Sequence, residues 1–117
     1  MYNYKKLPSW QAAIALSERI HTATADYLPT DHIGILSQIR ATSVKIVTQI
    51  ALGTGKSSQT AFALALEDAQ ILLYELDTQI ELAQRMEVLP TSVVDSFYFQ
   101  RHDLMQQLFR FTQTLVA

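Results

Sequence analysis

The sequence has no cysteine, only three glycines and three prolines among its 117 residues, and few charged side chains. The lack of cysteine excludes disulfides, thiolate catalysis and zinc sites built on cysteine. The scarcity of glycine and proline predicts long, uninterrupted elements joined by few turns. The charged fraction of 17% is below the usual quarter, which suggests that a partner covers more of the surface than usual.

Long apolar segments are missing as well. No run of roughly 20 apolar residues is free of charge, so we expect no membrane span. The segment 1–8 has no apolar run after its lysines and is not typical of a signal peptide. We therefore expect a cytoplasmic protein with a single domain, residues 1–117, built around one hydrophobic core.

Apolar residues recur three and four positions apart along most of the chain, and this spacing predicts amphipathic α-helices. The helices expected from it span residues 8–28, 31–52, 58–87 and 92–116. The N-cap candidates for the last three are Thr30 or Asp31, Ser57 or Ser58, and Thr91 or Ser92. Gly53 is expected to end the second helix in a left-handed conformation. Four helices with short connections predict an all-α, antiparallel, up-and-down four-helix bundle.

The last two helices carry more apolar surface than one core requires. In the third helix, Leu64, Ile71 and Tyr74 lie off the main apolar stripe. The main apolar stripe of the second helix includes Ile33. The fourth has a second strip beside its main seam, formed by Tyr98, Met105, Phe109, Thr112 and Val116. This breadth favours a homo-oligomer, although a thicker core within one subunit is the alternative.

The run Gly-Thr-Gly-Lys-Ser at residues 53–57 is similar to part of a phosphate-binding loop. The complete motif needs a glycine five positions before Gly55, where this chain has Ile50, and it needs a preceding strand. We interpret the run as a corner between two helices. Nucleotide binding is the enzyme-class alternative, and unchanged thermal stability with ATP or GTP and magnesium would exclude it.

No pattern indicates a catalytic, metal or cofactor site. His21, His32 and His102 fall in three different predicted helices, and none has a second ligand at helical spacing. The acidic pairs of the third helix have no nucleophile or oxyanion donor near them in the sequence. We therefore expect a protein that is not an enzyme and that holds no cofactor or metal.

Charge is distributed unevenly along the chain. Residues 30–57 carry a net charge of +2 and residues 58–89 carry −5, although the whole chain has only −2. The candidate contacts to RNA or another partner are Arg40, Lys45, Lys56, Lys5 and Lys6. A solvated basic face is the alternative interpretation of these cations.

Arg101 interrupts the apolar seam of the fourth helix. A buried guanidinium needs a partner, and Glu75 or Glu67 of the third helix could supply it. Alternatively, the side chain extends to solvent at the edge of the bundle, or several subunits place it around a symmetry axis.

Three segments carry a family resemblance: Lys6-Leu7-Pro8-Ser9-Trp10-Gln11, the stretch from Arg40-Ala41 to Gly53 followed by Lys56-Ser57 and Phe62, and Glu75-Leu76-Asp77-Thr78-Gln79. They resemble the bacterial four-helix-bundle family encoded by intervening sequences of large-subunit ribosomal RNA genes. Gln49 and Leu52 stand where the family has asparagine and glutamate.

The resemblance implies a ring-shaped homopentamer without catalytic activity that acts as a scaffold with RNA or ribonucleoprotein contact. A distant branch of the family implies an alternative function. Its members, the accessory variability determinants of diversity-generating retroelements, bind a reverse transcriptase and template RNA. A reverse-transcriptase gene and a template repeat beside this gene would favour that alternative.

Overall fold

The computed structural model describes residues 2–116, and four α-helices make up most of them. They are α1 (Pro8–Thr24), α2 (Ile35–Gly53), α3 (Gln59–Arg85) and α4 (Thr91–Val116). Two short 3-10 helices, η1 (Tyr4–Lys6) and η2 (Ala25–Thr30), precede and follow α1. The described residues contain no strand, so the predicted all-α class is confirmed.

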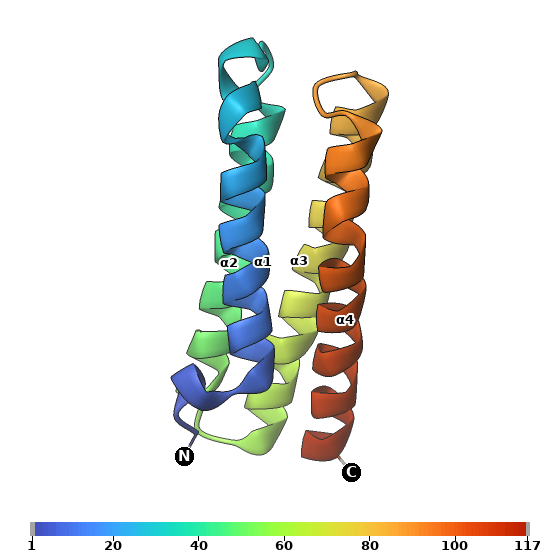
Figure 1. Cartoon of the computed structure of the whole chain (residues 1–117). Coiled ribbons are helices and arrows are strands. Elements are labelled where there is room, and N and C mark those ends of the chain that lie inside the picture. Colours follow the sequence, from blue (N-terminus) through green and yellow to red (C-terminus); the bar gives the residue numbers. More distant parts are fainter. Residues whose placement is uncertain (1, 117) are drawn as a thin grey trace.

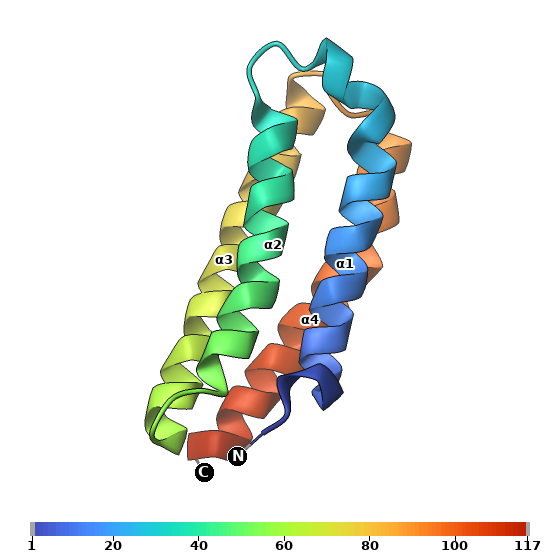
Figure 2. The same cartoon turned by 90° about the vertical axis from the view of Figure 1, so that its left-hand side faces the viewer.

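The helices alternate in direction and form an elongated bundle of 45 × 20 × 19 Å (Figure 1). Each helix packs against two others, so that α1, α2, α3 and α4 follow one another around the core and α4 returns to α1. Figure 2 shows α1 and α2 side by side, with their connection at the top. This is the predicted up-and-down four-helix bundle.

The core contains the apolar stripes that helical spacing predicts. Its largest fully buried side chains are Phe97, Leu16, Ile20, Leu36, Ile39, Ile46, Ile50, Leu66, Leu73, Leu76, Ile80 and Leu89. Leu16 and Leu89 were not expected among them, whereas Ile33, placed on the second stripe by its spacing, is 51% exposed. Ile33 lies before α2 begins, so helical periodicity does not govern its direction.

The connection between α1 and α2 differs from the prediction. The α-helical part of α1 ends at Thr24, not near residue 28, and η2 carries the chain through Pro29. α2 begins at Ile35 instead of residue 31, after Gly34 in a left-handed conformation with φ of 73°. Asp31 still caps this helix, because its carboxylate accepts hydrogen bonds from the backbone N–H groups of residues 35 and 36 at 3.2 and 2.8 Å.

The starts of α3 and α4 decide between the remaining N-cap candidates. Ser58 is the N-cap of α3, and its Oγ accepts a hydrogen bond from the backbone N–H of Ala61 at 3.0 Å. α4 already includes Thr91, so neither Thr91 nor Ser92 is its cap. The carbonyl of Pro90 accepts from the backbone N–H groups of residues 93 and 94 instead.

The end of α3 adopts the backbone conformation that usually selects glycine. Glu87 has a φ of 61°, the backbone N–H of Val88 donates to the carbonyl of Ala83 at 2.9 Å, and that of Glu87 donates to Gln84 at 3.0 Å. These two bonds define a Schellman motif with glutamate at its left-handed position. A side chain there strains the backbone by about 1 kcal/mol.

We expect Glu87→Gly to raise the free energy of unfolding by about 0.5–1 kcal/mol, because glycine relieves the strain at positive φ. The exposed helical residue Glu75 provides the matched control. Glu75→Gly should instead lower stability by about 1 kcal/mol. Urea denaturation of both variants tests this, and equal destabilisation by the two substitutions would contradict it.

Candidate functional site

The corner between α2 and α3 is a close-packed turn. Gly53 is the last residue of α2 and has no positive φ, which corrects the prediction of a left-handed glycine. Its role is steric, because a Cβ at this position would lie 2.8 Å from Cδ1 of Phe62 and 3.1 Å from Cβ of Ala65. The helix ends through bonds to the third preceding carbonyl, from Thr54 to Ala51 and from Gly55 to Leu52.

The two residues that depart from the family pattern have different environments. The side-chain amide of Gln49 donates to the carbonyl of Ala65 at 3.3 Å and so links α2 to α3. Leu52 is 59% exposed at the outside of the corner. Gln49 therefore contributes to the packing of the two helices, and Leu52 adds apolar surface.

The antiparallel fold separates charge along the bundle axis. We define the lower half, as oriented in Figure 1, as residues 2–16, 44–71 and 104–116, and the upper half as residues 17–43 and 72–103. The lower half has five cationic side chains and two carboxylates, a net charge of +3. The upper half has four cations and nine carboxylates, a net charge of −5. The molecule therefore has a basic end and an acidic end.

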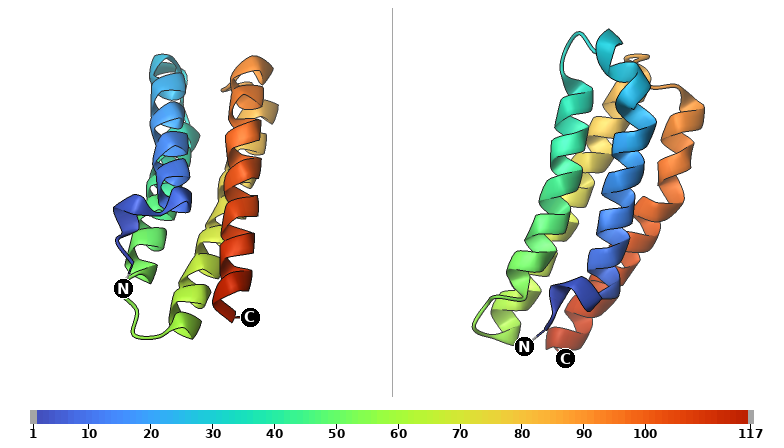
Figure 3. Two further views of the ribbon diagram at one scale, coloured as in Figure 1. Left: turned by 60° about the horizontal axis from the view of Figure 1, so that its bottom comes forward. Right: turned by 60° about the vertical axis from the view of Figure 1, so that its left-hand side comes forward.

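The sequence-predicted cations do not form a single strip. Lys5 and Lys6 in η1 lie at the same end of the bundle as Lys56, because the N-terminal arm packs beside the α2–α3 corner (Figure 3). Arg40 and Lys45 are five residues apart on α2, which places them about 140° apart around the helix axis. Arg40 lies in the upper half and Lys45 near the middle of α2, so neither joins Lys5, Lys6 and Lys56 at the corner.

Two residues at the basic end, Arg110 and Tyr2, were not predicted. Arg110 is exposed on the last turns of α4, and Tyr2 is 42% exposed on the N-terminal arm. The Tyr2 ring meets Phe62 and Phe111 edge to face, at centroid distances of 5.2 and 5.8 Å. Only the antiparallel order of the helices brings residues 2 and 110 to one end, so local sequence patterns contain no signal for this grouping.

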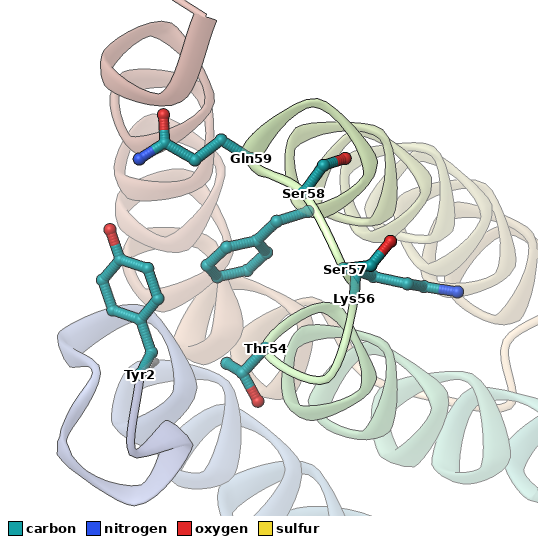
Figure 4. A pocket seen from close by; sticks show the side chains of 7 residues that line it. Tyr2, Thr54, Lys56, Ser57, Ser58 and Gln59 are labelled. Carbon is teal, nitrogen blue, oxygen red and sulfur yellow. The ribbon is translucent and has the colours of Figure 1, made fainter.

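A hollow of about 330 Å³ separates Tyr2 from the α2–α3 corner (Figure 4). Its other lining residues are Thr54, Lys56, Ser57, Ser58, Gln59 and Phe62. Figure 4 shows the Lys56 side chain pointing away from Tyr2, toward the outside of the corner. On that side Lys56 shares a second, smaller hollow with Gln49 and Asp68. The sequence 53–57 therefore forms a helix end and a loop, without the strand that a phosphate loop requires.

Arg101 is paired within the subunit. Its Nη1 donates to Oδ1 of Asp77 at 2.5 Å, and the two side chains are 14% and 45% exposed. The partner is thus Asp77, not Glu75 or Glu67, which are both exposed. Asp77 lies on the side of α3 that faces α4, whereas Glu75 and Glu67 point outward. The Nε atom of Arg101 is buried and has no hydrogen-bond partner.

Large apolar side chains cover the outside of α3 and α4. We call this surface the α3–α4 apolar face; it consists of Ile71, Tyr74, Tyr98, Met105 and Phe109. Leu64 and Leu82 are also exposed on α3, and Leu64 lines the hollow beside α2. Tyr74, Met105 and Phe109 line one hollow of about 320 Å³, and Tyr74, Tyr98 and Met105 line another of about 210 Å³. The predicted second strip of α4 is therefore exposed except for Met105, which is half-buried, and Thr112, which is buried and accepts a hydrogen bond from Gln70.

The histidines have separate surroundings. Nδ1 of His21 lies 2.8 Å from the carbonyl of Ser17, and His102 stacks on Tyr98 with ring centroids 5.8 Å apart. Among residues 2–116 there is no group of three or more side chains that could hold a metal ion. Over the same range, no helix has the length and apolarity needed to cross a membrane.

Comparison with known proteins identifies one family. The family model described as 23S rRNA-intervening sequence protein matches residues 5–110, from η1 to the last turns of α4. A search of curated proteins found no match. Because the family match covers nearly the whole chain, this protein belongs to the 23S rRNA-intervening sequence protein family.

Proposed function

We propose that this protein is a non-enzymatic, homo-oligomeric scaffold, assembled as a pentamer, that contacts RNA through its basic end. The α3–α4 apolar face is the observation that carries the proposal. Ile71, Tyr74 and Tyr98 are each more than 60% exposed, although they are large apolar or aromatic residues. Soluble monomers rarely expose a contiguous apolar surface of this kind, so we expect a second copy of the chain to bury it.

The polar groups within this surface are compatible with burial. The Asp77 carboxylate already satisfies one nitrogen of Arg101, which reduces the cost of removing the pair from water. The unpartnered Nε of Arg101 is buried inside the subunit, so this atom is not a contact to an adjoining subunit. Whether Arg101 lies near an oligomer axis stays a prediction.

The basic end supports the RNA part of the proposal. Lys5, Lys6, Lys56 and Arg110 of one subunit are too few for tight binding, but a ring repeats them in every subunit. Several phosphates could then be contacted at once, with an affinity that falls steeply with salt. The acidic upper half would keep RNA away from the opposite end of the ring.

Light scattering tests the assembly, because a mass of one 13.2 kDa chain would contradict it. Fluorescence anisotropy with a labelled RNA at several salt concentrations tests the contact. We expect the triple variant Lys5→Gln, Lys6→Gln, Lys56→Gln to bind more weakly and with a shallower salt slope. Arg19→Gln, Arg40→Gln, Arg85→Gln removes the same charge from the upper half and should have less effect. Equal weakening by both triple variants would contradict the assignment to the basic end.

A further inference from the structure

A second pocket at the basic end has features of a ligand site. It has a volume of about 330 Å³, the lower range for small-molecule pockets, and lies between the N-terminal arm and the last turns of α4. Its lining residues are Tyr2, Leu7, Pro8, Ser9, Gln107, Arg110 and Phe111. The wall is mostly apolar, with a few polar groups from two different elements.

One of these polar groups is buried and unsatisfied. Ser9 is only 3% exposed, and its Oγ has no hydrogen-bond partner. A buried hydroxyl without a partner destabilises the fold unless a bound molecule satisfies it. Gln107 uses its amide nitrogen to bond Asp103 at 2.7 Å, so its amide oxygen can accept a second bond. The pocket is therefore lined by a serine whose hydroxyl is unsatisfied and by an amide oxygen that can accept.

The aromatic wall suits a planar group. Tyr2 is partly exposed, and Phe111 lines the same pocket, so two aromatic rings border it. Arg110 adds a charged guanidinium to the same wall. A flat ring with polar edge atoms and an attached phosphate matches this combination of aromatic surface, hydroxyl, amide and cation.

We propose that this pocket takes an unpaired nucleobase of single-stranded RNA, with Tyr2 as the stacking surface and Arg110 as the phosphate contact. This inference rests on the proposed RNA contact and identifies the form of RNA that the basic end recognises. A strand is favoured over a free nucleotide because the rest of the lower half, without Arg110, still carries a net charge of +2, and further phosphates would lie there.

The test is fluorescence anisotropy with a labelled single-stranded oligonucleotide, using a duplex of the same length and free mononucleotides as competitors. We expect Tyr2→Ala to weaken binding about 5- to 150-fold, the range for loss of one base–aromatic stack. Tyr2→Phe keeps the ring and should bind as the parent does. Ser9→Ala should change the preference among four homopolymeric oligonucleotides, because it removes the hydroxyl that contacts the base edge.

Lys45→Gln is the matched charge control for Arg110→Gln, because it removes one cation of the lower half that does not line the pocket. We expect Arg110→Gln to weaken binding more. If Tyr2→Ala and Lys45→Gln have the same small effect, the base pocket is wrong although the RNA contact stands. If mononucleotides compete as well as the oligonucleotide, RNA is not the occupant. If no RNA binds while light scattering shows an oligomer, both RNA proposals fail and the scaffold remains.

Discussion

Phe109→Glu is expected to convert the proposed oligomer into single subunits. Phe109 is 56% exposed in one chain and forms part of the α3–α4 apolar face. In the assembly a carboxylate at this position would be buried without a partner, at a cost of several kcal/mol in every interface. Glutamate is a good helix former, so α4 itself should not be weakened. Light scattering should show the mass of one 13.2 kDa chain, with unchanged helical circular dichroism.

Phe99→Glu is the matched control on the same helix. Phe99 is 77% exposed and lies ten residues from Phe109, which places it about 80° away around α4 and outside the apolar face. The same substitution there should leave the oligomer intact. Dissociation by Phe99→Glu but not by Phe109→Glu would move the interface to another side of α4. Two oligomeric variants would contradict the proposed interface.

Gly53→Val should produce the largest loss of folding stability among the substitutions considered for the α2–α3 corner. The added Cβ would lie 2.8 Å from the Phe62 ring, which is itself 4% exposed and cannot move freely. Forcing extra carbon atoms into a packed site costs about 1–3 kcal/mol, and a branched side chain belongs at the upper end of this range. We expect a loss of about 2–3 kcal/mol, or roughly 10 °C in Tm.

Gly55→Ala provides the control two residues later. The nearest atom to its added Cβ is the carbonyl oxygen of Leu52 at 3.5 Å, an ordinary contact. Gly55 has no positive φ, so alanine is tolerated and should change stability little or raise it by up to about 1 kcal/mol. Thermal unfolding at one fixed protein concentration compares the variants. A harmless Gly53→Val would show that the corner is not close-packed.

Local features were predictable where a short-range interaction decides them. The Ser58 cap depends on a hydroxyl three residues before the N–H that it binds, and the sequence alone shows that spacing. For Gly53 the local pattern predicted the wrong backbone conformation. A glycine at a helix end usually indicates a left-handed turn, but here the packing of Phe62 requires it, while Glu87 occupies the left-handed position at the end of α3. Glycine at a helix end can thus be selected either by a left-handed backbone conformation or by close tertiary packing.

In the candidate site, too, some features could be predicted from the sequence and others depended on the fold. Arg101 could be identified as a charge on an apolar seam, but its partner could not, because the choice between Asp77 and its neighbours depends on how α3 is rotated against α4. Likewise, Lys5, Lys6 and Lys56 were candidates from their charge, whereas Arg110, Tyr2 and Ser9 became part of one end only through the fold.

The sequence by itself determined the helices, the bundle and the family, because period 3.6 patterning and helix-breaking residues act over a few positions. Only the tertiary structure decided which residues from opposite ends of the chain meet. The antiparallel order brings the N-terminal arm, the α2–α3 corner and the end of α4 together, and thereby creates the basic end. The reason is physical: the rotation of each helix is set by mutual packing of all four apolar stripes, which no single stripe specifies.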